Sequence, residues 1–126
     1  MRKPADRHTL TASIALEEKA MIADLRIYTC KPNKMAEWVA MYKEMAWPLQ
    51  QKYLGRCLGW FTTVEGELNT VVHIWGYEDQ GDRERRRKAM AADPEWQKFL
   101  AEGYRRELLL KQENRIMAPT DFSPVK

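Results

Sequence analysis

Three polar side chains at two-residue spacing form the first group in this sequence whose types could do chemistry. Asp24, Arg26 and Tyr28 supply a carboxylate, a guanidinium and a phenol. On a β-strand they would share one face, because successive side chains alternate. Such a face could line a ligand pocket. It could equally form a paired Asp–Arg set at a dimer interface, because both environments require satisfied charges.

His73 and Trp75 form a second group with the same spacing. His73 could act as a base, a haem ligand or a polar anchor in a pocket, because its ordinary pKa lies near neutrality. The simpler interpretation, which we favour, is a hydrogen-bonded histidine on a strand beside Trp75. Any ligand site is expected where these two residues meet the polar face formed by Asp24, Arg26 and Tyr28.

Each residue of that expected site has a distinct role. Arg26 would hold an anionic or carbonyl group of the ligand, and Asp24 would orient Arg26. Either His73 or Tyr28 would exchange a proton. The competing interpretation is that the same residues only lock a dimer together.

Arginines at helical spacing make a third group, formed by Arg83, Arg86 and Arg87. Together they could receive a phosphate or carboxylate. We favour a solvated helix face instead, with Glu84 pairing with Lys88 four residues later.

Other chemical signals are weak or absent in the sequence. There is no glycine-rich phosphate loop, no nucleophile elbow, no His-Glu-x-x-His and no cysteine cluster. We therefore predict no metal and no cofactor, while cofactor-free oxygenation stays open because it leaves no motif. The five tryptophans could line an aromatic cavity, but most are more simply core residues: Trp38, Trp47, Trp60, Trp75 and Trp96.

Hydrophobic periodicity predicts the elements that must position these residues. Alternation predicts strands over residues 22–30, 57–64 and 70–77, the last two joined by a hairpin-length connection at 65–69. A helical rhythm begins at Met35, with a kink or restart at Pro48 and an end at a left-handed Gly55.

The second half of the chain predicts two helices and a last strand. Asp79 or Asp82 can cap a helix that runs to about Ala92, and Asp93-Pro94 begins another helix at once. The apolar face of that helix is predicted to contain Trp96, Phe99, Leu100, Gly103 and Tyr104. Residues 108–117 are ambiguous between helix and strand, and we interpret them as a strand because it completes a sheet.

This order predicts an α+β fold, a ferredoxin-like βαββαβ domain. Its four-stranded antiparallel sheet would carry helices on one face only. The other face would be partly apolar and open, which is typical of an association surface. We therefore expect a homodimer built by facing two sheets.

The length and composition of the chain fit one domain of ordinary size. The chain has 126 residues, 44% of them hydrophobic and 31% charged, with a net charge of +3. We divide it into a tail over 1–20 that folding does not need, a domain over 21–118 and a tail over 119–126.

The charge is too balanced for a nucleic-acid partner, and no apolar run reaches the ~20 residues of a membrane span. Two cysteines, Cys30 and Cys57, suit free thiols in a reducing cytoplasm.

The sequence resembles the NIPSNAP family from about residue 21 to 126. The resemblance rests on segments whose order and spacing together are specific: Leu25-Arg26-Ile27-Tyr28-Thr29, Lys31-Pro32-Asn33-Lys34, Leu54-Gly55, Leu68-Asn69-Thr70-Val71-Val72-His73-Ile74-Trp75, Asp82-Arg83-Glu84-Arg85-Arg86, Asp93-Pro94-Glu95-Trp96, Glu113-Asn114-Arg115-Ile116-Met117 and Phe122-Ser123-Pro124. The family usually has glycine where this chain has Asn33, and asparagine tolerates the left-handed backbone.

The resemblance implies a ferredoxin-like monomer that pairs into a dimeric α+β barrel. Related barrels include antibiotic-biosynthesis-type monooxygenases, EthD-like proteins and haem-handling enzymes, so the resemblance implies no settled reaction. We expect a small molecule to bind in the barrel, with a cofactor-independent, monooxygenase-like activity as one reading. The alternative is a non-catalytic interaction or scaffold protein, and the sequence leaves open whether the chain is an enzyme.

Overall fold

The computed structural model describes residues 21–126 of the chain, so the expected tail over 1–20 lies outside the described residues. The elements follow one another in this order: β1 (Ile22–Cys30), α3 (Met35–Met41), the π-helix η1 (Tyr42–Ala46), α4 (Trp47–Tyr53), β2 (Arg56–Thr62), β3 (Thr70–Tyr77), α5 (Gln80–Ala91), α6 (Pro94–Arg106) and β4 (Leu109–Met117).

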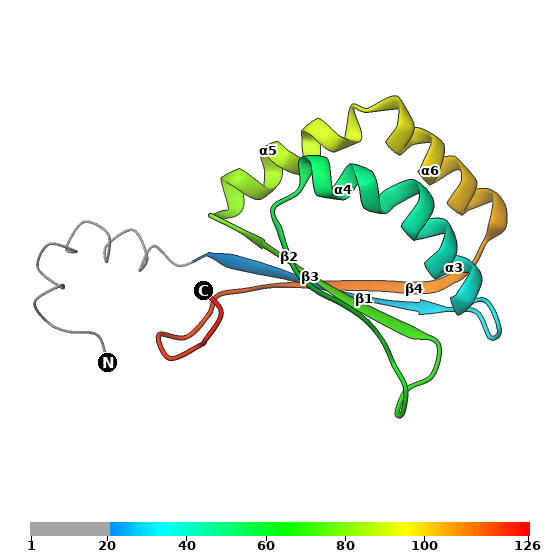
Figure 1. Cartoon of the computed structure of the whole chain (residues 1–126), viewed down its shortest axis with the longest axis horizontal. Helices are drawn as coiled ribbons and strands as arrows, with labels where there is room; N and C mark the ends of the chain where they lie inside the picture. The colour runs from blue at the N-terminus through cyan, green and yellow to red at the C-terminus, as the bar shows by residue number, and fades with distance from the viewer. Residues whose placement is uncertain (1–20) are drawn as a thin grey trace, which may run out of the picture.

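The strands form one antiparallel sheet in the order β2-β3-β1-β4. All helices of the described part lie over one face of this sheet, and its other face is uncovered (Figure 1). The predicted α+β, ferredoxin-like βαββαβ fold is therefore confirmed, including the last strand that the sequence left ambiguous. None of the helices within residues 21–126 is long and apolar enough to cross a bilayer.

Register brings the two chemical groups of the sequence onto the same side of the sheet. Asp24 stands opposite Trp75, and Arg26 stands opposite His73, in the antiparallel pairing of β1 with β3. Cross-strand partners share a face, and this face is the one beneath the helices. The polar residues of β1 therefore do not lie on the open face through which two sheets could pair, which counts against their reading as a dimer-interface set.

The first helical segment differs from its prediction in two ways. The expected kink takes the form of the π-helical turn η1, which ends directly before α4, and Pro48 lies in the first turn of α4. The end of the segment needs no left-handed residue, because Leu54 is extended and Gly55 lacks a positive φ. Glycine fits at position 55 for another reason: any side chain there would collide with the carbonyl oxygen of Gly76 on β3.

Other turns follow the sequence closely. Asn33 adopts the left-handed backbone with φ 67°. The Asp79 side chain accepts a hydrogen bond from the Asp82 N–H at 2.8 Å, and Asp93 accepts one from the Glu95 N–H at 2.8 Å, so both are N-caps. Tyr104 departs from its prediction, because its side chain is 81% exposed instead of lying on the buried face of α6.

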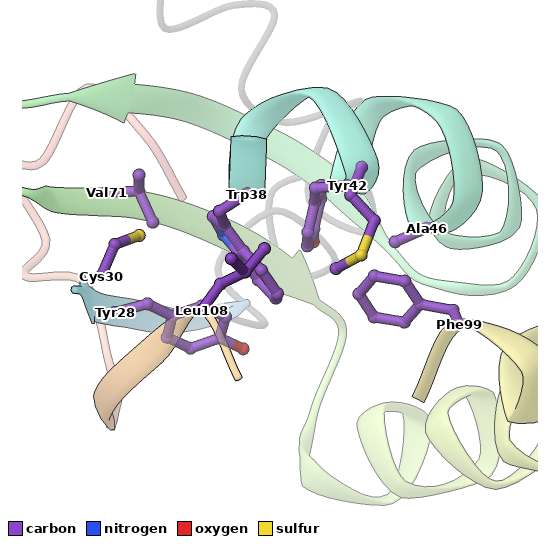
Figure 2. Packing of buried hydrophobic residues seen from close by; sticks show 9 residues of the cluster. Tyr28, Cys30, Trp38, Tyr42, Ala46, Val71, Phe99 and Leu108 are labelled. Atoms are coloured by element: carbon purple, nitrogen blue, oxygen red, sulfur yellow. The ribbon is translucent and has the colours of Figure 1, made fainter. Parts of the chain in front are cut away.

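The core fills the space between the sheet and the helices as two clusters. Its larger cluster is shown in Figure 2, where Trp38 points from the helical layer toward Tyr28 on β1, Tyr42 lies beside Trp38, and Phe99 enters from α6. Trp75, Tyr77, Leu54 and Met90 form the centre of the smaller cluster. Large aromatic side chains dominate both clusters and so set the spacing between sheet and helices.

Candidate functional site

A cavity of about 640 Å³ lies between the covered face of the sheet and the helices α3, η1 and α6. Its walls are largely aromatic, with Trp38, Tyr42, Trp96 and Phe99 among the lining residues. The exposed Tyr104, at the end of α6, marks the mouth. The volume and the mixture of apolar walls with a few polar groups suit a small organic molecule.

Arg26 and Tyr28 present the polar floor of this cavity. The Arg26 Nε–H donates to the Tyr28 hydroxyl oxygen at 2.9 Å, and an Arg26 Nη1–H donates to Asp24 at 3.0 Å. The Arg26 side chain is only 16% exposed. Because the Tyr28 oxygen is an acceptor in this pair, its own O–H is left to donate elsewhere.

Asp24 lies fully buried below the floor and joins three elements. Its carboxylate also accepts from the Arg83 Nε–H on α5 at 2.9 Å and from the Asn114 side chain on β4 at 3.2 Å. Burial alone would raise the pKa of Asp24, but the charge of Arg26 and the hydrogen bonds from Arg83 and Asn114 lower it below its ordinary value. Asp24 is therefore a carboxylate that fixes the position of Arg26.

The arginines of α5 do not form the solvated face that the sequence favoured. Arg83 is committed to Asp24, as described, and Arg87 lines the cavity. Arg86 donates to Asp82 at 2.8 Å and to the carbonyl oxygen of Leu54 at 3.3 Å, so it ties α5 to the end of α4. Within residues 21–126 the expected pair of Glu84 with Lys88 is not among the ion pairs. The prediction was wrong because helical spacing does not reveal which face packs on a buried acid.

His73 is fully buried behind the floor and is not among the cavity-lining residues. Its Nδ1 accepts the Trp75 indole N–H at 2.8 Å, and its ring stacks on Trp60 with centroids 4.8 Å apart. Burial, together with the charge of Arg26, lowers the pKa of His73 to about 3. The imidazole is therefore neutral near pH 7, with its proton on Nε2 because Nδ1 is the acceptor. The His73 and Tyr28 rings pack edge-on with their centroids 4.9 Å apart, so His73 supports Tyr28 from the side away from the cavity.

Tyr42 is a cavity residue that sequence reasoning missed. It begins the π-helix η1 and donates its hydroxyl hydrogen bond to the Gln50 side chain on α4. It also borders a second hollow of about 240 Å³ with Trp47 and Trp60, so its ring is the wall between the two spaces. π-Helical turns occur frequently at functional sites, and Pro48 was the only sequence signal that pointed toward this irregularity.

Two kinds of reactive centre find no support in the described part of the chain. Residues 21–126 contain no group of three His, Cys, Asp or Glu side chains placed to hold a metal ion. Burial raises the pKa of the Cys30 thiol to about 11, which disfavours a thiolate nucleophile. The groups on the cavity floor can bind and orient a ligand through N–H donors of Arg26, and the Tyr28 hydroxyl group can donate a hydrogen bond or exchange a proton.

Comparison with known proteins gives concordant matches. The family model named NIPSNAP matches residues 23–124. Protein NipSnap homolog 3A of Pongo abelii is 37% identical over 94 residues, which are 74% of this chain and 37% of that protein. The chain thus spans about a third of the length of most of these curated relatives, and 19% of one from Caenorhabditis elegans.

Solved structures agree with these matches. A NIPSNAP-like domain protein from Burkholderia xenovorans has 42% identity and a TM-score of 0.76, covering 82% of this chain and 89% of that one. A NIPSNAP family protein with unknown function from Agrobacterium tumefaciens has 32% identity and a TM-score of 0.80. The match covers 87% of this chain and 97% of that one. A putative antibiotic biosynthesis monooxygenase from Chloroflexus aurantiacus shares the fold alone. Its identity is 16% and its TM-score 0.55, over 84% of this chain and 99% of that one.

Proposed function

This chain belongs to the NIPSNAP family, and from that premise we propose that its domain binds a small molecule in the cavity between sheet and helices. The observation that carries the proposal is a guanidinium, Arg26, held at the floor of an aromatic cavity by a fully buried carboxylate. A side chain fixed in this way is pre-organised, so little entropy is lost when it binds a ligand.

The residues of the site divide into those that touch the ligand and those that position them. Arg26 contacts an anionic or carbonyl group, and Tyr28 donates its O–H beside it. Asp24 orients Arg26, while Trp75 holds His73 against the ring of Tyr28. His73 therefore acts through Tyr28, and proton exchange falls to Tyr28 because, of these two residues, only Tyr28 lines the cavity.

Native mass spectrometry of the purified protein tests this assignment. We expect a bound molecule at up to one per chain, and Arg26→Ala should lose it because the anchoring guanidinium is gone. His73→Ala should weaken retention by loosening Tyr28. Arg105→Ala is the matched control, since Arg105 is exposed and pairs with Glu102 on the outside of α6. Retention of the molecule by folded Arg26→Ala would contradict the assignment.

Cofactor-independent oxygenation is the reaction we propose for this cavity if the protein is an enzyme. A phenolic substrate would itself supply the electrons: one oxygen atom of O2 replaces the hydrogen on a ring carbon, the phenol becomes a quinone, and the second oxygen atom leaves as water. Arg26 would stabilise the phenolate that reacts with O2, since a guanidinium favours the charged form of a neighbouring oxygen. A purified protein that takes up no O2 with any phenolic ligand that it binds would leave it a binding protein.

We also propose that two copies pair through the uncovered face of the sheet. This face carries alternating apolar residues of the central strands, Leu25 and Ile27 from β1 with Val72 and Ile74 from β3, none of them fully buried in the single chain. Phe61 on β2 lies 57% exposed. A sheet with one uncovered apolar face gains stability by burying it against a second copy.

Light scattering at micromolar concentration is expected to give the mass of a dimer. Ile74→Asp should yield a folded monomer, because the charge would be buried in the dimer but partly exposed in the single chain. Val64→Asp is the control, since Val64 is 87% exposed in the β2–β3 connection. A monomer mass for the unaltered protein, or a dimer that survives Ile74→Asp, would contradict this mode of pairing.

A further inference from the structure

Positive charge gathers on one side of the cavity without a matching set of carboxylates. Arg26 and Arg87 both line it, and Arg83 lies beside them on α5. Among the described residues, Asp24 is the one carboxylate in contact with this group, and it binds Arg26 and Arg83. Arg87 makes no ion pair within residues 21–126. Asp24 is thus shared by two of the three guanidinium groups, and among the described residues two of the three positive charges remain uncompensated beside the cavity.

The only acidic residue of the described part that lines the cavity cannot offset these charges. Glu107 is at the mouth, where its carboxylate lies 3.9 Å from the ammonium of Lys31, and its side chain is 76% exposed. That pair is neutral in sum and faces solvent. The interior therefore keeps its positive potential, which low surrounding polarity strengthens.

Arg26 also keeps donors that the protein does not use. Its Nε and Nη1 atoms bind Tyr28 and Asp24, while its Nη2 has no partner among the described residues. Arginine cannot lose its proton, and a guanidinium in a desolvated place is stabilised by an anionic partner. A carboxylate matches the fork of N–H groups on a guanidinium, so it can bind two of them in parallel.

The rest of the cavity selects a flat, apolar body for that anion. Trp38 and Phe99 pack against each other in the cavity wall with ring centroids 6.0 Å apart and planes tilted by 48°, and Trp96 packs on Phe99 at 4.9 Å. Aromatic walls favour aromatic or unsaturated ligands, which can stack or approach edge-on. Besides the charged residues, the polar side chains of the lining are Gln50, Gln112 and three tyrosines, so one anionic group on the ligand is enough to pair with the two arginines.

From these observations we propose that the cavity takes a planar aromatic acid, bound as its carboxylate between Arg26 and Arg87. This inference rests on the proposed function and adds the chemical class of the ligand. It resolves the choice between an anionic and a carbonyl group in favour of the anion. Arg87 becomes a binding residue, although the sequence favoured a solvated role for it.

A pair of probes of equal shape tests the charge. 2-Naphthoate is anionic at pH 7.5 and 2-naphthamide is neutral, and binding of each is measured by quenching of tryptophan fluorescence. We expect naphthoate to bind at least about tenfold more tightly, since hydrogen bonds to charged groups are stronger than neutral ones. Arg87→Gln and Arg26→Gln should each remove most of that difference. Arg105→Gln, on the exposed side of α6, should leave it unchanged.

The outcomes separate the inference from the proposed function. Equal binding of the two probes, or tighter binding of naphthamide, would overturn the inference and leave a binding cavity in place. Binding of neither probe, by protein whose circular dichroism shows it folded, would count against the cavity as a binding site and against both proposals. Arg87→Gln carries the test if Arg26→Gln fails to fold, because Arg87 has no ion-pair partner in the described chain to disrupt.

Discussion

Replacing Asp24 with asparagine is expected to cost about 3–5 kcal/mol of unfolding free energy, because removing one partner of a buried ion pair leaves the other uncompensated. Asp24 is fully buried and is the carboxylate that Arg26 and Arg83 share. Asparagine has nearly the same shape, so the loss would report the missing charge rather than a cavity. Urea denaturation followed by circular dichroism measures it.

Two further variants show whether charge is the cause. Arg83→Met alone should cost less than Asp24→Asn, because Asp24 keeps its bonds to Arg26 and Asn114. Combining Asp24→Asn with Arg83→Met should be less destabilising than the sum of the two, since the second change removes one of the stranded cations. A loss below about 1 kcal/mol for Asp24→Asn would show that the network is screened and does not fix Arg26.

Much of the fold could be predicted because local chemistry and long-range packing agree. The alternation in residues 22–30 and 70–77 gives the faces of β1 and β3, and these are the faces that the register joins. Asp93 followed by Pro94 fixes the start of α6 to the residue, because a cap and a proline at the first turn leave no other start. Such signals act within a few residues, so no tertiary knowledge is needed.

The candidate site could be predicted only in part. The sequence placed Asp24, Arg26 and Tyr28 together, because a strand repeats every two residues. It could not place Arg83, whose partner is 59 positions away in the chain. Nor could it place Tyr42 at the wall between two hollows, because a π-helical turn shifts every later side chain around the helix axis.

Gly55 shows the same limit from another side. The sequence explained it by backbone conformation, whereas the structure explains it by the approach of Gly76 on β3. Both are ordinary uses of glycine, and only the tertiary pairing distinguishes them. The local sequence therefore predicts that a glycine is required at this position, but it does not predict which neighbouring residue imposes that requirement.

His73 is expected to make the domain unstable in mild acid. Burial lowers its pKa to about 3, whereas in the unfolded chain it titrates near its ordinary value of about 6.5. At a pH between these two pKa values, His73 is protonated in the unfolded state and neutral in the native state, so acid favours unfolding. Stability from this residue is complete above about pH 6.5 and is lost as the pH falls toward about 3, at about 1.4 kcal/mol per pH unit.

Unfolding free energies measured by urea denaturation from pH 6.5 to pH 4.5 test this, since carboxylates contribute little until lower pH. Over that window we expect the protein to lose about 2–3 kcal/mol more than His73→Gln loses, because each unit of pKa difference is about 1.4 kcal/mol. Glutamine does not titrate and still offers an oxygen to the Trp75 N–H. Equal slopes for the protein and the variant would mean that His73 accepts its proton while folded, most simply by reaching water beside Tyr28. In that case it could exchange protons in the cavity after all, and its role would be chemical as well as supporting.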